Sequence, residues 1–115
     1  MLRAEIRLVE FGQVQAREPA HRRPAMIVSN DGANSMAGRL GQGVITVVPT
    51  TSNVTRVHPF QVLVAADVSG LERDSKAQAE QVRSVSVERA REPVGSVPAP
   101  LMLGPDETLR LDLAL

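Results

Sequence analysis

The strongest constraint on the fold of this chain is a series of short apolar runs separated by turn-forming residues. Runs rich in Val, Ile and Leu occupy residues 24–29, 44–48 and 60–65, and each is five or six residues long. Runs of this length and composition are typical of buried strands rather than of helices. Three less regular segments complete the set of predicted strands: residues 4–11, 77–85 and 94–97. The pattern predicts a mainly β fold, a single twisted sheet closed or half closed into a barrel.

The connecting segments are polar and rich in Gly, Pro and Asn. Residues 12–23 form an unperiodic polar stretch, which predicts a loop longer than a tight hairpin needs. The Asn-Asp-Gly sequence at 30–32 predicts a turn, and residues 33–40 have room for one helical turn. Another turn is expected at 71–74.

The C-terminal segment fits two structures. Pro105, followed by Asp106 and Glu107, favours the start of a helix. Four leucines, however, alternate strictly at 109, 111, 113 and 115, which is a strand period. The pattern alone leaves both structures open.

Composition limits the kind of protein. The chain has 115 residues, which is enough for one domain spanning 1–115. It contains two Phe, both expected inside, and no Trp, Tyr or Cys, so an aliphatic core is expected, with no disulfide, thiolate metal site or Cys nucleophile. Two histidines cannot by themselves hold a structural zinc ion. We expect neither a signal peptide nor a membrane span.

The charges balance overall but are unevenly distributed. Thirteen basic residues oppose thirteen acidic ones, which argues against binding nucleic acid by bulk positive charge. Residues 1–60 nevertheless carry seven arginines against four acidic residues. A basic arginine face is therefore possible in this half, and the planar guanidinium matches phosphate geometry.

A few polar residues could carry chemistry. Arg23 stands where the polar loop meets a buried strand, and Pro24 fixes the backbone after it. The hydroxyl and amide cluster at 50–53 follows another buried strand, where it could donate to a phosphate or simply cap the strand. His21 and His58 could form an acid–base pair, although nothing in the sequence brings them together. Glu18 could act as a base or pair with a neighbouring arginine.

Several segments, in a set order, carry a resemblance to a known family. They are Arg-Ala-Glu-Ile at 3–6, Arg-Pro-Ala-Met-Ile-Val-Ser-Asn-Asp at 23–31, Val-Val-Pro-Thr-Thr-Ser-Asn at 47–53, His-Pro-Phe-Gln-Val at 58–62, residues 71–75, Glu-Gln-Val-Arg-Ser at 80–84, Val-Gly-Ser-Val at 94–97 and the leucine-rich end. Over nearly the whole chain they resemble the MazF/PemK family of toxin endoribonucleases.

The resemblance implies an SH3-like barrel of the CcdB–PemK type with short helices and a C-terminal helix, here over the last ten residues. It implies a cytoplasmic bacterial homodimer, controlled by a MazE-like antitoxin, that cuts single-stranded RNA, often mRNA, at short sequences. No metal or other cofactor is expected, and the products are a 2′,3′-cyclic phosphate and a 5′-hydroxyl. Residue by residue, the resemblance implies Arg23 and Thr51 as catalytic residues. Contacts to RNA are expected from Glu18, Arg17, Ser52, Asn53, Gln81 and Arg83.

The first 20 residues depart from the family pattern. Ala4 replaces a glycine, Arg7 replaces an aromatic residue, and Ala16-Arg17 replaces Gly-Ser before Glu18. Loss of the glycine narrows the backbone conformations available there. Two other functions remain open: a CcdB-like toxin that binds gyrase without cutting RNA, and a diverged, weakly active homologue that binds antitoxin.

Overall fold

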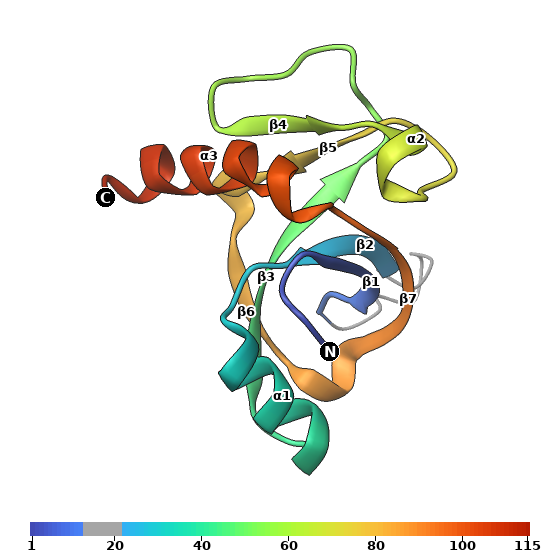
Figure 1. The fold of residues 1–115 in the computed structure, drawn as a ribbon, viewed down its shortest axis with the longest axis vertical. Helices are drawn as coiled ribbons and strands as arrows, with labels where there is room; N and C mark the ends of the chain where they lie inside the picture. Colours follow the sequence, from blue (N-terminus) through green and yellow to red (C-terminus); the bar gives the residue numbers. More distant parts are fainter. Residues whose placement is uncertain (13–21) are drawn as a thin grey trace.

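The computed structural model describes residues 1–12 and 22–115, and within them seven strands form one antiparallel sheet. The strand order is β4-β5-β3-β2-β1-β7, with β6 pairing with β3 off this path (Figure 1). Their bounds are β1 (Glu5–Glu10), β2 (Arg22–Ile27), β3 (Val44–Thr51), β4 (Gln61–Val64), β5 (Ser75–Gln78), β6 (Arg83–Ser86) and β7 (Ala90–Ser96). The predicted mainly β class is confirmed.

The core is aliphatic and forms two clusters on opposite faces of the central strands. Ala25 and Ile27 of β2 pack into one cluster, and Met26 between them packs into the other, as strand alternation requires. Phe11 packs at the edge of the first cluster. Phe60, which was also expected inside, is 38% exposed beside β4, so this prediction is wrong.

Residues 30–40 form more helix than was predicted. The helix α1 (Asp31–Leu40) covers nearly all of this stretch. Asn30 caps its N-terminus by accepting a hydrogen bond from the Ala33 N–H, and Gly41 closes its C-terminus in the left-handed conformation. An Asn that predicts a turn also serves as a helix cap, which explains the difference.

The strand predicted at 77–85 is divided in two, so that prediction was wrong. The register pairs Thr50 with Ala77 but Val47 with Arg83, which leaves three extra residues on the outer chain. They are taken up by a 3₁₀ turn, η1 (Ala79–Gln81). The chain thus follows one edge of β3 as two strands, β5 and β6, rather than as one.

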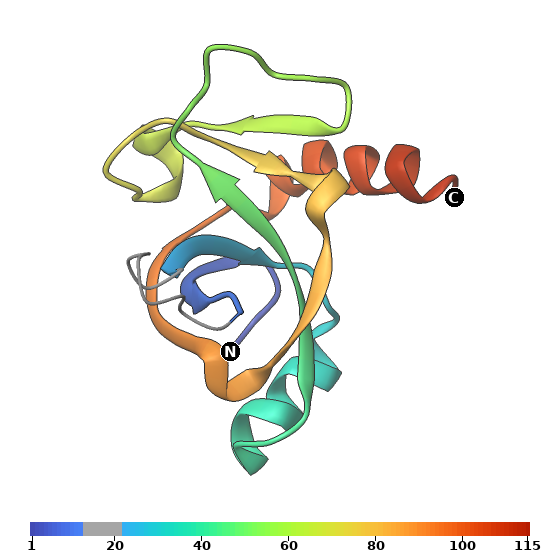
Figure 2. The same cartoon turned by 180° about the vertical axis from the view of Figure 1, so that it is seen from behind.

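The C-terminal helix α3 (Leu103–Leu113) resolves the ambiguity of the tail. It begins three residues before the expected start and includes Pro105 in its first turn, where a missing N–H costs little. It follows a short 3₁₀ turn, η3 (Ala99–Met102), and contacts β4 and η1. Figures 1 and 2 show it lying along the β4–β5 end of the sheet, with α1 at the opposite end. A four-residue helix, α2 (Ala66–Ser69), follows β4 and was not predicted.

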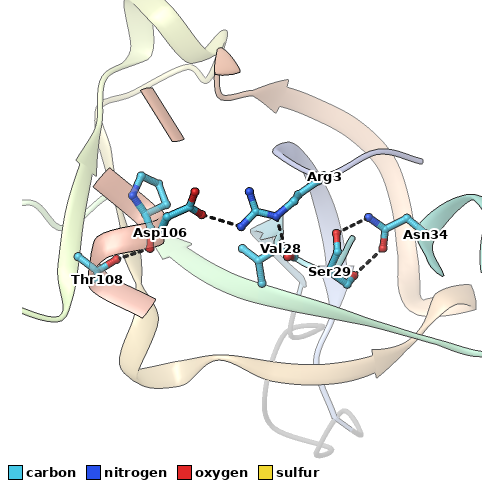
Figure 3. A network of polar contacts seen from close by, with 7 residues as sticks. Arg3, Val28, Ser29, Asn34, Asp106 and Thr108 are labelled. Carbon is cyan, nitrogen blue, oxygen red and sulfur yellow. Dashed lines mark hydrogen bonds and ion pairs between the residues drawn. The ribbon is translucent and has the colours of Figure 1, made fainter. Parts of the chain in front are cut away.

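Arg3 ties α3 to the sheet. Its Nη2 contacts Oδ1 of Asp106 at 2.6 Å, and its Nε donates to the carbonyl of Val28 at 2.9 Å (Figure 3). Beside it, the fully buried Asn34 of α1 donates to the carbonyl of Ser29. These contacts fix both helices against the end of β2. No helix among the described residues is long and apolar enough to cross a membrane.

Candidate functional site

Arg23 is the second residue of β2 and is half-buried. Both hydrogens of its Nη2 are used: this atom donates to the Thr50 carbonyl at 3.2 Å and to Oε1 of Gln78 at 2.6 Å. Because the Thr50 carbonyl belongs to the peptide bond that leads into Thr51, the tip of Arg23 lies within one peptide unit of Thr51. The structure therefore brings together the two residues that were predicted as catalytic.

The two adjacent threonines at the end of β3 differ in availability. Thr50 is buried, and its hydroxyl donates to the Pro24 carbonyl at 2.9 Å, which ties β3 to β2 beside Arg23. Thr51 is half-exposed, and its Oγ1 accepts from the Asn53 N–H at 3.3 Å. The proton of Thr51 has no acceptor among the described residues and remains available for a ligand. Thr51, not Thr50, is thus the hydroxyl that can donate at this site.

Polar side chains follow the outer edge of β3 on one face. The register pairs Val47 with Arg83 and Thr51 with Lys76, and alternation places Gln78 on the same face as Lys76. Arg83 is exposed, and its guanidinium carbon lies 5.3 Å from the centre of the Phe11 ring. Of this row, Gln78 reaches Arg23 directly, whereas Arg83 stacks on Phe11 at the far end.

The loop after β3 borders two clefts. Ser52 and Pro24 line one of about 460 Å³, together with residues of the segment that follows α2. Asn53 lines a second of about 380 Å³, together with Thr55, Arg56, His58 and Lys76. Both residues predicted to contact RNA here are exposed, and so is Gln81 in η1. None of the three forms a hydrogen bond with Arg23 in the described part of the chain.

Other predicted residues lie outside the described range. Arg17 and Glu18, expected to contact RNA, belong to residues 13–21, as does His21. His58 is exposed, and its backbone N–H donates to Oε1 of Gln61 at 3.0 Å. Among residues 1–12 and 22–115, no group of three or more His, Asp or Glu side chains is arranged to hold a metal ion. The described part of the site is built from guanidinium, hydroxyl and amide groups, which suit an anionic ligand.

Comparison with known proteins gives this chain a family. The family model for PemK-like, MazF-like toxins of type II toxin–antitoxin systems matches residues 2–111. The chain belongs to this family. It is 51% identical over 115 residues to endoribonuclease MazF9 of Mycobacterium tuberculosis, covering all of this chain and 98% of that protein. It is 34% identical to endoribonuclease MazF6 of the same species over 113 residues, covering 98% and 96% of the two chains.

Solved structures of MazF toxins share the fold of this MazF-like chain. MazF in a MazE–MazF crystal structure from Deinococcus radiodurans superimposes with a TM-score of 0.79 at 22% identity, covering all of this chain and 96% of that one. The M. tuberculosis toxin MazF-mt6 gives 0.75 at 20% identity, covering 96% and 97%. The predicted fold, mainly β with short helices and a C-terminal helix, is confirmed.

Sequence reasoning missed two residues of this candidate site. Gln78 holds Arg23, and Lys76 stands opposite Thr51 on the neighbouring strand. Their only signal in the sequence is the polar alternation of residues 76 and 78. That alternation becomes informative only once the pairing of β5 with β3 is known.

One departure from the family pattern has a visible consequence. Ala4, which replaces the family's glycine, has a φ of 76°. This left-handed conformation is one that glycine adopts freely and alanine does not. Ala4 thus adopts a backbone conformation that is more typical of glycine.

Proposed function

We propose that this chain is a toxin endoribonuclease that cleaves single-stranded RNA, mRNA foremost, at a short specific sequence. Cleavage of mRNA would inhibit translation and arrest growth. The observation that carries the proposal is the guanidinium of Arg23, held by Thr50 and Gln78 beside the hydroxyl of Thr51. Membership in the MazF-like family and the relatives named as endoribonucleases support it.

The proposed reaction is a transesterification within the RNA. A ribose 2′-oxygen attacks the adjacent phosphorus while the bond from phosphorus to the 5′-oxygen breaks. The products are a 2′,3′-cyclic phosphate and a 5′-hydroxyl. The 2′-hydroxyl proton goes to Glu18 or to water, and the leaving 5′-oxygen takes its proton from Arg23, which regains one from solvent. No metal ion enters the reaction.

Arg23 and Thr51 would stabilise the charge that builds on the phosphate. Among the described residues, Nε and Nη1 of Arg23 have no acceptor, so each can donate a charge-assisted hydrogen bond to a phosphate oxygen. Thr51 adds a hydroxyl donor. Removing one such donor costs about 3–4 kcal/mol of transition-state stabilisation. A guanidinium stays protonated at neutral pH, so Arg23 acts as a donor and not as the base.

The proposal includes a homodimer in the bacterial cytoplasm and a cognate MazE-like antitoxin. Apolar side chains on the surface support the existence of such partners. One group lies on α1 and the start of β3, and the other lies on the C-terminal helix and tail. Their members are Met36, Leu40 and Val44, and Leu103, Leu111, Leu113 and Leu115.

The test is cleavage of a long mixed RNA by the purified protein in EDTA, with the new ends mapped by sequencing. We expect cuts at one short motif, with 5′-hydroxyl ends. Arg23→Ala and Thr51→Ala should each lower the cleavage rate by about 10²–10³-fold. Thr51→Ser, which keeps the hydroxyl, should retain most of it, and Arg39→Ala on α1 serves as the control for loss of one arginine. Intact RNA in all samples would refute the proposal.

The same variants separate the two other functions. A gyrase-binding toxin would stay toxic after Arg23→Ala, because it does not use this arginine for chemistry. A diverged homologue would bind antitoxin tightly without arresting growth. Loss of toxicity and of RNA cleavage together in Arg23→Ala supports the endoribonuclease.

A further inference from the structure

Lys76 is the single lysine of the chain and is only 7% exposed. Its Nζ donates to the carbonyl of Arg56 at 2.6 Å. Among the described residues, no carboxylate forms an ion pair with it. This ammonium therefore has one carbonyl partner and no counter-charge in the described part of the chain, and an anion in the adjacent cleft would supply the counter-charge.

The cleft beside Lys76 suits an anion. Its other lining residues are Asn53, Thr55, Arg56 and His58, none of them acidic. The nearby carboxylates are occupied by contacts elsewhere. Asp74 accepts from the Ala66 N–H at 2.8 Å, and Glu80 accepts from Nε2 of Gln61 at 2.7 Å.

The cleft adjoins the candidate catalytic residues. Thr51 and Lys76 are directly paired across β3 and β5, so their side chains leave the same face. The Cβ atoms of directly opposed residues are about 4.5–5.5 Å apart. On the same face, two residues along β5, Gln78 holds Arg23. An RNA strand bound at Arg23 and Thr51 therefore passes next to the cleft.

We propose that this cleft is a subsite for one backbone phosphate of the bound RNA, a neighbour of the scissile phosphate. Lys76 is its buried cation, and Arg56 adds a second cation at the exposed rim. This inference rests on the proposed function, because it takes RNA as the ligand. The lysine orients the strand and takes no part in bond breaking.

The test removes one charge from the protein and one from the RNA. The probe is an oligoribonucleotide centred on the mapped cleavage site, with a 2′-deoxy nucleotide at the attacking position so that it binds uncut. Methylphosphonates replace its phosphates one at a time. For wild-type protein, one neutral position near the scissile phosphate should weaken binding about tenfold. Lys76→Met replaces the lysine with an apolar side chain of similar length. It should weaken binding of the unmodified probe about as much as that methylphosphonate weakens binding to wild type. The methylphosphonate should then cause no further loss of affinity in this variant.

Salt dependence gives a second readout. Each phosphate contact contributes about 0.7 to the slope of log Kd against log salt for a single strand. Lys76→Met should lower this slope by about that amount. The matched control is Arg39→Met, which removes one positive charge from α1 at the other end of the molecule (Figure 1). Each methylphosphonate should weaken RNA binding by Arg39→Met as much as it weakens binding by wild-type protein.

Three results would overturn the subsite. The affinity losses from Lys76→Met and from the methylphosphonate could be additive at every phosphate position. Lys76→Met could weaken RNA binding no more than Arg39→Met does, or could leave RNA binding unchanged. If Lys76→Met does not fold, Arg56→Met decides, because the Arg56 side chain is exposed. Coupling of Arg56→Met to a phosphate beside the scissile one supports the subsite, and its absence refutes it. If wild-type protein leaves all RNA intact, the proposed function fails separately. In that case the subsite is tested alone by binding a random-sequence RNA dodecamer. The slope of log Kd against log salt is then compared between Lys76→Met and Arg39→Met.

Discussion

Gln78 accepts a hydrogen bond from Nη2 of Arg23 at 2.6 Å, across the gap between β5 and β2. The Thr50 carbonyl, on the intervening strand, takes the second hydrogen of the same nitrogen. The guanidinium is thus held at Nη2, while Nε and Nη1 have no acceptor among the described residues and can donate to a phosphate. In the proposed reaction Gln78 is a positioning residue, since it acts through Arg23 and not on the RNA.

Gln78→Leu removes the acceptor while keeping the side-chain volume. We expect kcat for RNA cleavage to fall about tenfold, or about 1.4 kcal/mol in activation free energy, with KM changed less than twofold. Gln78→Glu restores an acceptor oxygen but adds a negative charge beside the phosphate. It should keep Arg23 in place and raise KM instead.

The control for these variants is Gln61→Leu. Gln61 is buried and donates to Glu80, so its loss should lower the midpoint of thermal unfolding without changing kcat. If Gln78→Leu behaved like Gln61→Leu, with lower stability and normal kinetics, the positioning role would be wrong.

The sequence predicted the sheet because its strands are short apolar runs with clear ends. It left the tail ambiguous because only one of the four alternating leucines, Leu109, faces the core. Met102, Pro105 and Leu109 face the core, and their spacing of three and four residues is helical. Leu111 and Leu113 are exposed and carry no packing information.

The site was predicted only in part. Arg23 and Thr51 followed from a family resemblance, not from spacing, since 28 positions separate them in the chain. The positions of Gln78 and Lys76 in the site depend on the three extra residues between β5 and β6, because these set the register of β5 against β3. Nothing in the local sequence specifies that insertion.

Arg23→Lys tests whether the shape of the guanidinium matters beyond its charge. A lysine ammonium is a point charge and cannot hold Gln78, Thr50 and two phosphate oxygens in one plane. We expect its cleavage rate to lie within about tenfold of that of Arg23→Ala, where the loss is about 10²–10³-fold. Single-turnover rates on the mapped oligoribonucleotide measure this. Activity equal to that of wild type would show that charge alone suffices.

Ala4→Gly should stabilise the fold. Ala4 has a φ of 76°, and relief of this strain outweighs both the lost methyl contact and the greater freedom of glycine in the unfolded chain. We expect the free energy of unfolding to rise by about 0.5 kcal/mol, measured by urea denaturation. Ala114→Gly is the matched control: Ala114 also has a positive φ, of 59°, but it lies at the exposed C-terminal end of α3 and should change stability less. A lower stability of Ala4→Gly would contradict the strain argument.

Gly95 and Gly38 should respond to alanine in opposite directions. A Cβ on Gly95 of β7 would lie 2.6 Å from the Ser69 carbonyl oxygen, so backbone atoms would have to move. Gly95→Ala should lower the free energy of unfolding by about 1–3 kcal/mol. A Cβ on Gly38, inside α1, would meet only the Met1 Cβ at an ordinary 3.7 Å, and alanine favours helix by about 0.5–1 kcal/mol. In urea denaturation, the unfolding midpoint of Gly95→Ala should therefore lie below that of wild type, and the midpoint of Gly38→Ala should lie above it. A Gly95→Ala midpoint at or above that of wild type would show that β7 and α2 are not in close contact.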